Sequence, residues 1–221
     1  MTTPKVSVIM PAFNGESFIR RAIESVLRQT LQDWELVVVI DGPTDAMPQI
    51  VAGMADQDSR IRVFTQPNRG QSSARNRAVA ESRSAMIAYL DYDDEYHPEY
   101  LASVAERAAA DVIQVSCYEI FDERPMSGSF GELWVWNPGR RRHEFPRKNI
   151  FVPLGVAHHR HWHEDVGGFD ESLRCDEDTD LWRRFAEAGA EVEYLDRLSG
   201  VYHLRAASQS RVRLEPSEPP Q

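Results

Sequence analysis

Acidic side chains gather at two places where a short apolar run of the sequence ends. Asp41 follows the run ELVVVI at 35–40, and Asp91, Asp93 and Asp94 follow the run MIAYL. Runs that are apolar throughout are typical of parallel strands buried on both faces. Because the carboxyl ends of neighbouring parallel strands meet at one crevice, we expect these four carboxylates to lie close together. Like charges so placed repel one another, so the cluster predicts a bound cation.

The expected cation is Mg²⁺ or Mn²⁺, because carboxylate oxygens are hard ligands. An ion held by one or two carboxylates usually takes its other ligands from water and substrate phosphates. The chain has 25 Lys and Arg residues against 35 Asp and Glu, a formal net charge of −10. That charge repels DNA and RNA and argues against a nucleic-acid partner. For Asp41, the alternative is an ordinary loop carboxylate without a ligand.

The usual phosphate-binding loops are absent. The first strand–turn–helix, VSVIMPAFNGESF, contains one glycine and no GxGxxG pattern for a dinucleotide. The chain has no GxxxxGK[ST] pattern, which excludes a P-loop nucleotidase. A metal-dependent phosphatase with a nucleophilic D-x-D stays an alternative. Phosphatases of the haloacid-dehalogenase type carry that motif on the first strand, whereas here it follows the fourth.

The order of the expected elements predicts an α/β protein with a doubly wound, mostly parallel sheet. One domain is expected over 1–210, and a disordered tail over 211–221. No apolar run is long enough to cross a bilayer, and the first apolar stretch predicts a strand and not a signal peptide, which favours the cytoplasm. Strands are expected at 6–10, 35–40, 61–65, 84–91, 111–121, 191–195 and 200–204, and helices at 16–29, 45–57, 71–83, 98–109 and 177–188.

Residues 122–149 differ in composition from the rest of the chain. They are rich in Gly and Pro and contain Trp134, Trp136 and the run Arg140–Arg142. We expect an excursion over the active face, with or without a short hairpin. Aromatic faces stack on sugar rings and Arg binds acidic groups, so the excursion is expected to meet an acceptor. A packed lid with solvated Arg side chains is the equal alternative.

Four histidines, His158, His159, His161 and His163, fall within six residues. Four imidazoles could bind Zn²⁺. In an extended segment only the last three share a face, and no complete zinc spacing accompanies them. We therefore favour a polar segment that flanks the acceptor side.

The helix expected from about Glu177 begins with three acids. Carboxylates are favoured in the cap and first turn by the helix dipole, and capping suffices to explain Asp176. Asp178 differs, because Leu181 and Trp182 lie one turn further on and place it above the apolar face. Partial burial raises the proton affinity of a carboxylate, which suits Asp178 to be a general base.

Together these motifs resemble the family 2 glycosyltransferases, which have the Rossmann-like GT-A fold. VSVIMPAFNGESFIRRAIESVLRQT is similar to the opening strand, turn and helix of that family, LVVVIDGPTD to its "VDDGSTD" motif, and NRGQSSARN to its "ARN" segment. AYLDYDDEYHP resembles the metal motif, and VGGFDESL with DEDTDLWRRFAEAG resembles the block that carries the catalytic base. The resemblance covers about residues 5–210. Ile40 replaces the first Asp of the second motif and Pro43 replaces its Ser, which could alter the nucleotide preference.

The resemblance implies an inverting, metal-dependent transfer of a sugar from a nucleotide-diphosphate donor to a hydroxyl. A UDP-sugar is the first expectation for the donor, a glycan or lipid-linked sugar for the acceptor, and polysaccharide biosynthesis for the setting. Mn²⁺ or Mg²⁺ is the implied cofactor. The implied nucleotide-sugar contacts are Pro11, Ala12, Asn14, Glu16, Asp41, Arg75 and Asp91; the implied metal ligands are Asp93 and His203; the implied base is Asp178.

A non-catalytic nucleotide-sugar-binding protein is an alternative from a different class. Intact Asp93 and Asp178 argue against it. Peripheral contact with the inner face of a membrane and a homodimer both stay open. Also open are the sugar, the nucleobase, the acceptor and the role of His203 as a ligand.

Overall fold

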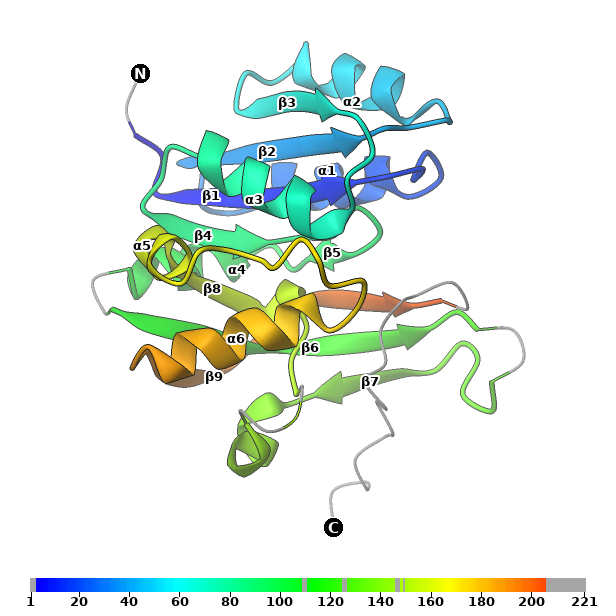
Figure 1. Ribbon diagram of the computed structural model, residues 1–221. Helices are drawn as coiled ribbons and strands as arrows, with labels where there is room; N and C mark the ends of the chain where they lie inside the picture. Colours follow the sequence, from blue (N-terminus) through cyan, green and yellow to red (C-terminus); the bar gives the residue numbers. More distant parts are fainter. Residues whose placement is uncertain (1–2, 109–110, 125–126, 146–147, 149, 206–221) are drawn as a thin grey trace.

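The computed structural model describes residues 3–108, 111–124, 127–145, 148 and 150–205. Among them, the strands form one curled sheet in the order β3-β2-β1-β4-β8-β6-β9-β5, with β7 paired to β6 (Figure 1). The strands are β1 (Val6–Ala12), β2 (Trp34–Asp41), β3 (Ile61–Gln66), β4 (Met86–Tyr89), β5 (Glu95–Tyr96), β6 (Val112–Asp122), β7 (Leu133–Trp136), β8 (Val156–His159) and β9 (Glu191–Leu204). The helices are α1 (Ile19–Leu27), α2 (Met47–Ala55), α3 (Gln71–Glu81), α4 (Tyr100–Glu106), α5 (Arg160–Asp165) and α6 (Glu177–Glu187), with 3₁₀ turns η1 (Pro138–Glu144) and η2 (Pro153–Gly155).

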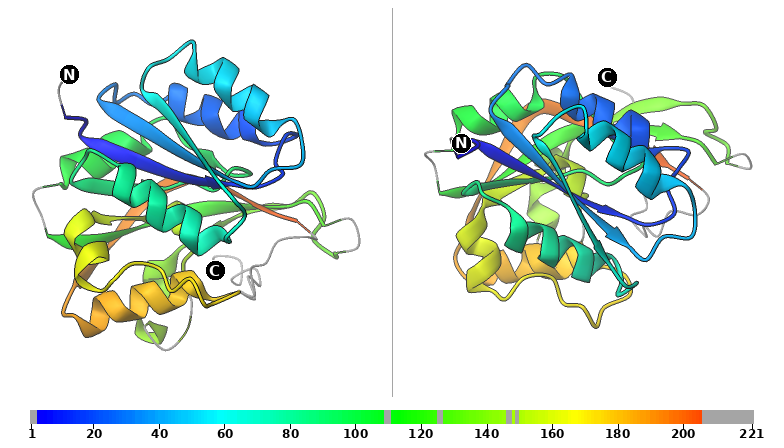
Figure 2. Two further views of the ribbon diagram at one scale, coloured as in Figure 1. Left: turned by 45° about the horizontal axis from the view of Figure 1, so that its top comes forward. Right: turned by 90° about the horizontal axis from the view of Figure 1, so that it is seen from above.

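The N-terminal half of the sheet is parallel. Strands β3, β2, β1 and β4 run side by side in the same direction. Every residue of β1 and β2 is buried, because helices α1 and α2 cover one face of this half and α3 covers the other (Figure 2). Burying one Val, Leu or Ile side chain contributes about 1.5–3 kcal/mol. The predicted doubly wound α/β arrangement is confirmed.

The C-terminal half of the sheet is mixed. Strand β8 lies antiparallel between β4 and β6, whereas β9 runs parallel to β6 and β5 runs antiparallel to β9. Neither β5 nor β8 was expected from the sequence, since both are short. The two strands expected at 191–195 and 200–204 are one strand, β9, with an irregular register opposite β6.

The described part of residues 122–149 contains the short hairpin that is one of the two arrangements expected for this segment. After β6 the chain turns back as β7, which pairs antiparallel with β6, and η1 follows. This β6–β7 hairpin extends the sheet instead of leaving it, because alternate residues of β7 pack inward. Trp136 is buried and its indole N–H donates to the carbonyl of Ile150 at 2.7 Å.

The remaining expectations concern the ends of elements. Pro48 lies in the first turn of α2, where its missing N–H leaves no helix hydrogen bond unmade, so it is compatible with the helix expected at 45–57. No helix in the described ranges is long and apolar enough to span a bilayer. The tail expected at 211–221 and the end of the predicted domain lie outside the described residues.

Candidate functional site

A cleft of about 990 Å³ lies at the carboxyl ends of β1, β2 and β4. The start of α3, the segment after β4, residues 171–178 and the end of β9 complete its wall. Ligands of open α/β sheets bind at this edge, so the cleft has the expected place. Of the residues singled out from the sequence, Pro11, Ala12, Asp41, Arg75, Asp91, Asp93, Asp178 and His203 line the cleft, and Asn14 and Glu16 do not.

Asn14 and Glu16 instead join the loop after β1 to the loop after β2. The Asn14 Oδ1 accepts from the backbone N–H of Thr44 at 2.8 Å. The Glu16 Oε2 accepts from the backbone N–H of Ala46 at 2.9 Å, and the backbone N–H of Glu16 donates to Asp45 Oδ2 at 2.9 Å. Both residues therefore shape the cleft by holding two of its loops together.

Asp41 is buried and its carboxylate fixes the loop that leads into α3. Its Oδ1 accepts from Gln66 Nε2 and the N–H of Arg69, each at 2.9 Å, and its Oδ2 accepts from the N–H of Gly70 at 2.8 Å. Gly42 follows with φ of 67°, and a Cβ there would lie 2.6 Å from a backbone nitrogen of that loop. Asp41 thus holds the loop, in addition to any contact with a ligand.

Arg75 is buried at the base of the cleft and bridges two carboxylates. Its Nη2 donates to Asp91 Oδ1 at 2.9 Å and its Nη1 donates to Glu177 Oε1 at 2.8 Å. Burial alone would lower the pKa of Arg75, but the carboxylates of Asp91, Glu177 and Asp178 outweigh it and raise that pKa. Arg75 therefore ties the segment after β4 to the start of α6. No sequence pattern indicates the contact to Glu177.

Asp93 and Asp94 lie next to each other in different surroundings. The Asp93 Oδ2 accepts from Arg205 Nη1 at 2.6 Å, and burial, followed by the nearby charge of Asp91, raises the pKa of Asp93. Asp94 is 1% exposed and therefore does not face the solvent. Its Oδ1 accepts from the N–H of His203 at 2.9 Å, and burial raises the pKa of Asp94 well above its usual range.

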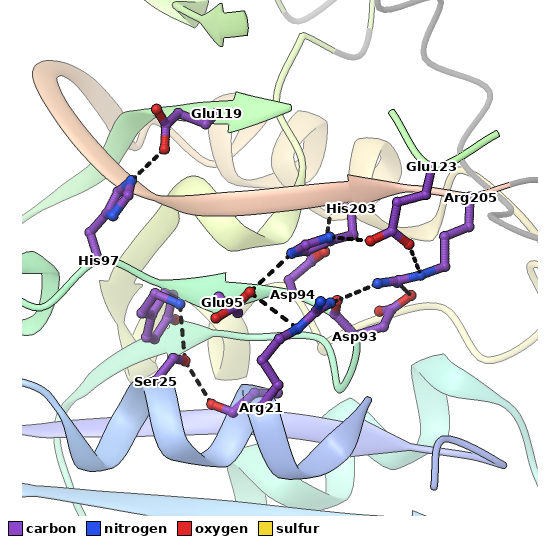
Figure 3. Close-up of polar contacts among 12 residues, drawn as sticks. Arg21, Ser25, Asp93, Asp94, Glu95, His97, Glu119, Glu123, His203 and Arg205 are labelled. Carbon is purple, nitrogen blue, oxygen red and sulfur yellow. Dashed lines mark hydrogen bonds and ion pairs between the residues drawn. The ribbon is translucent and has the colours of Figure 1, made fainter. Parts of the chain in front are cut away.

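His203 is nearly buried, and each of its ring nitrogens faces a carboxylate (Figure 3). Its Nδ1 lies 2.7 Å from Glu123 Oε1 and its Nε2 lies 3.2 Å from Glu95 Oε1. Burial lowers the pKa of His203 below its usual value. To act as a metal ligand, His203 must give up one of these two contacts.

The carboxylates on the cleft wall nevertheless suit a hard cation. Asp91 and Asp93 both line this edge of the cleft, and their carboxylate oxygens are hard ligands. Across the described ranges, no three His, Cys, Asp or Glu residues form a complete metal-binding group. This arrangement fits an ion held by one or two carboxylates that takes its other ligands from phosphates and water.

Asp178 is the second residue of α6 and lines the cleft, half-buried. Its Oδ1 accepts from the N–H of Thr179 at 2.7 Å, and Trp182 one turn on is buried as expected. Asp178 lies close enough to Arg75 for its charge to contribute to the raised pKa of Arg75. Asp176 occupies the N-cap position of α6 with φ of 58°, as expected, although its side chain makes no cap hydrogen bond in the described structure.

The described part of the 122–149 segment contributes no side chain to the cleft wall. The expectation of an excursion over the active face is therefore wrong for these residues. Trp134 is half-buried, whereas Phe130, Leu133 and Val135 are the large apolar side chains that the hairpin exposes. This surface lies apart from the nucleotide-sized cleft.

The histidine cluster also lies away from the cleft wall. His158 is buried in β8, where its Nε2 lies 2.9 Å from the Tyr89 hydroxyl, and burial lowers its pKa to about 3. His161 faces Asp111 at 2.8 Å on the surface, and His163 faces Asn76 at 3.1 Å. These histidines have separate partners, so they neither form a zinc group nor line the cleft.

Comparisons with known proteins agree with this geometry. The family model described as Glycosyl transferase family 2 matches residues 7–166. The uncharacterized glycosyltransferase EpsJ of Bacillus subtilis is 39% identical over 97% of this chain, and the chondroitin synthase of Pasteurella multocida is 29% identical over 84%. The chain spans 65% of the length of the first and 19% of the second, less than two thirds of either.

Two solved structures have the same fold at low sequence identity. TarS of S. aureus, residues 1–349 in complex with UDP-GlcNAc, has a TM-score of 0.75 and 20% identity over 92% of this chain and 60% of its own. The mannosyltransferase PcManGT of Pyrobaculum calidifontis, in complex with GDP-Man and Mn²⁺, has a TM-score of 0.67 and 21% identity over 91% of this chain and 57% of its own. The expected GT-A fold is confirmed.

Proposed function

Because this chain belongs to glycosyl transferase family 2, we propose that it transfers a sugar from a nucleotide-diphosphate donor to an acceptor hydroxyl. The observation that carries the proposal is that Asp91, Asp93 and Asp178 line one cleft at the carboxyl ends of parallel strands. The first two provide the acidic edge that a cation and a diphosphate require. The third provides a carboxylate on the same wall for proton transfer.

In the proposed reaction, Asp178 accepts the proton of the acceptor hydroxyl as the hydroxyl oxygen attacks the anomeric carbon. The bond from that carbon to the diphosphate breaks, and the diphosphate leaves with the electron pair. The transition state has oxocarbenium character, and one displacement inverts the anomeric configuration. A divalent cation held by Asp93, with His203 as the second candidate, would stabilise the negative charge on the leaving diphosphate.

The donor and acceptor classes are inferred from the named structures and relatives. TarS was solved with UDP-GlcNAc and PcManGT with GDP-Man and Mn²⁺, which supports a nucleotide-sugar donor, a UDP-sugar first, and Mn²⁺ or Mg²⁺ here. Relatives named as chondroitin and hyaluronan synthases support a glycan or lipid-linked acceptor and a role in polysaccharide biosynthesis. The cytoplasmic location, contact with a membrane face and a homodimer stay predictions.

Removal of metal is expected to abolish most binding of UDP or GDP. A dianionic ligand meets an acidic cleft edge in a chain of net charge −10, so a cation must neutralise the approach. Titration calorimetry with UDP and GDP, in Mn²⁺ and in EDTA, measures this. Asp93→Asn is expected to remove the metal dependence. Asp94→Asn is expected to change it less, since an Asn oxygen still accepts from the N–H of His203.

Equal nucleotide affinity in Mn²⁺ and in EDTA would contradict the metal role. An Asp94→Asn variant that loses the metal effect as fully as Asp93→Asn would move the metal ligand from the half-buried carboxylate of Asp93 to the buried carboxylate of Asp94.

The paired change Arg140→Ala and Arg142→Ala is expected to weaken acceptor use without changing donor affinity. Both side chains are exposed on η1, and η1 lies outside the cleft wall. If the two exposed guanidinium groups bind an acidic acceptor, the loss of both contacts to that acceptor predicts a rise in acceptor KM on the order of tenfold. Acceptor KM and donor Kd are measured side by side, with Arg20→Ala on the exposed side of α1 as the matched control. A comparable loss of donor affinity would place η1 beside the donor.

A further inference from the structure

Arg205, at the end of β9, holds the carboxylate that is the proposed metal ligand. Its Nη1 donates to Asp93 Oδ2 at 2.6 Å and its Nη2 donates to the Asp93 carbonyl at 3.1 Å. The Nε of Arg205 lies 2.7 Å from Glu123 Oε2. Figure 3 shows this guanidinium between the two carboxylates. The contact is therefore a fork, with the carboxylate of Asp93 on one side and that of Glu123 on the other.

Neighbouring side chains hold the guanidinium of Arg205 in place. Its guanidinium carbon lies 4.1 Å from the centre of the Phe18 ring, a cation–π contact. The side chain is 13% exposed and also lines the cleft. A planar guanidinium held by two carboxylates and an aromatic face loses little additional freedom when one of those contacts is exchanged.

The charge of Arg205 acts at the oxygen that a metal ion would use. Arg205 forms an ion pair with the Asp93 carboxylate at 2.6 Å. Asp91 has its own cation, Arg75, at 2.9 Å. Asp93 is thus neutralised by Arg205, and a guanidinium and a divalent ion on the same side of one carboxylate oxygen repel each other.

We propose that Arg205 and a divalent cation compete for the carboxylate of Asp93, and that Arg205, once displaced, contacts the diphosphate of the donor. This inference rests on the metal role in the proposed function. The contacts to Glu123 and Phe18 keep the displaced guanidinium on the cleft wall. Metal alone then binds weakly, because it must break the Arg205–Asp93 pair. Metal and diphosphate together bind well, because the freed guanidinium gains a second anion.

The variant Arg205→Gln is expected to change the affinity for Mn²⁺ alone and the affinity for UDP in opposite directions. Without the competing guanidinium, the affinity for Mn²⁺ alone is expected to rise on the order of tenfold, the size of one charge-assisted hydrogen bond. At saturating Mn²⁺, the affinity for UDP is expected to fall by about the same factor. Electron paramagnetic resonance of free Mn²⁺ measures the first, and calorimetry with UDP measures the second, so neither readout depends on activity.

Arg69→Gln is the matched charge control. Arg69 also lines the cleft, but its ion pair is with Glu171 at 3.1 Å and not with Asp93. Mn²⁺ affinity in Arg69→Gln is expected to match the unmodified protein, measured without nucleotide. Arg205→Lys keeps the charge but loses the fork, and is expected to fall between the unmodified protein and Arg205→Gln. It also serves as the test variant if thermal unfolding shows that Arg205→Gln does not fold.

Three results would overturn the inference. The first is an affinity for Mn²⁺ that is unchanged or lower in Arg205→Gln, or in Arg205→Lys where that variant replaces it. The second is an equal gain in the affinity for Mn²⁺ in Arg69→Gln. The third is an affinity for UDP that rises together with the affinity for Mn²⁺. Failure of the proposed function looks different. In that case both shifts in affinity appear as expected, but no sugar is transferred to any acceptor.

Discussion

Asp178→Asn is expected to lower the rate of sugar transfer by about 10²–10⁴-fold, the range for a lost general base. Asn has the size of Asp and its oxygen still accepts from the N–H of Thr179, but it cannot take the acceptor proton. Because the carboxylate lies on the cleft wall and makes none of the contacts that hold Asp93, the folded structure and metal binding should survive. Product formation at saturating donor and metal measures the rate, and calorimetry measures donor binding separately.

Two neighbours in the same turn provide controls for Asp178. Asp176→Asn changes an exposed cleft carboxylate that makes no cap hydrogen bond, so the rate should stay near that of the unmodified protein. Glu177→Gln removes the partner of Arg75 at 2.8 Å, so it should lower stability more than it lowers the rate. Normal turnover in Asp178→Asn, or a loss of donor affinity in step with rate, would make Asp178 a structural or donor contact. The base would then be sought at Glu177 or Asp176.

The parallel half of the fold could be predicted because its signals are local. The runs that form β1 and β2 are mostly apolar and buried at every residue, and a helix with an apolar face separates them. The antiparallel insertion of β8 left no such signal. Its four residues, VAHH, include two histidines, and it becomes a strand because it pairs with β4 and β6 on either side. Pairing of this kind depends on tertiary contacts and not on residue pattern.

The site shows the same division. Asp91, Asp93 and Asp178 could be identified because each follows or precedes a recognisable element. Their partners could not be identified, since Arg75 meets Glu177 across 102 positions of sequence and Arg205 meets Asp93 across 112. A lone Arg after the strand GVYHL has no pattern that distinguishes it from a surface residue. Motifs therefore located the carboxylates, and only the folded chain located their counter-ions.

Arg75→Met is expected to lower the free energy of unfolding by about 3–5 kcal/mol, the usual cost of removing one partner of a buried ion pair. The Arg75 side chain is 2% exposed, and its loss leaves Asp91 and Glu177 without their shared cation. Met fills a similar volume, so the effect reports the charge more than the packing. Chemical denaturation measures the free energy. Arg77→Met is the matched control on the same helix, where the guanidinium donates to the carbonyl of Thr65 and pairs with no carboxylate in the described structure. It should cost about 1 kcal/mol or less.

The pH dependence of Arg75→Met distinguishes lost charge from lost packing. The ion pairs of Arg75 contribute only while the carboxylates of Asp91 and Glu177 carry their charges, and without Arg75 those partly buried charges are uncompensated. Acid removes the charges, so it weakens the pairing in the unmodified protein and relieves the repulsion in the variant. The deficit relative to the unmodified protein should therefore shrink between neutral and mildly acidic pH. A deficit that is the same at every pH would show that Arg75 acts by filling space, and that the link between the segment after β4 and the start of α6 is not electrostatic.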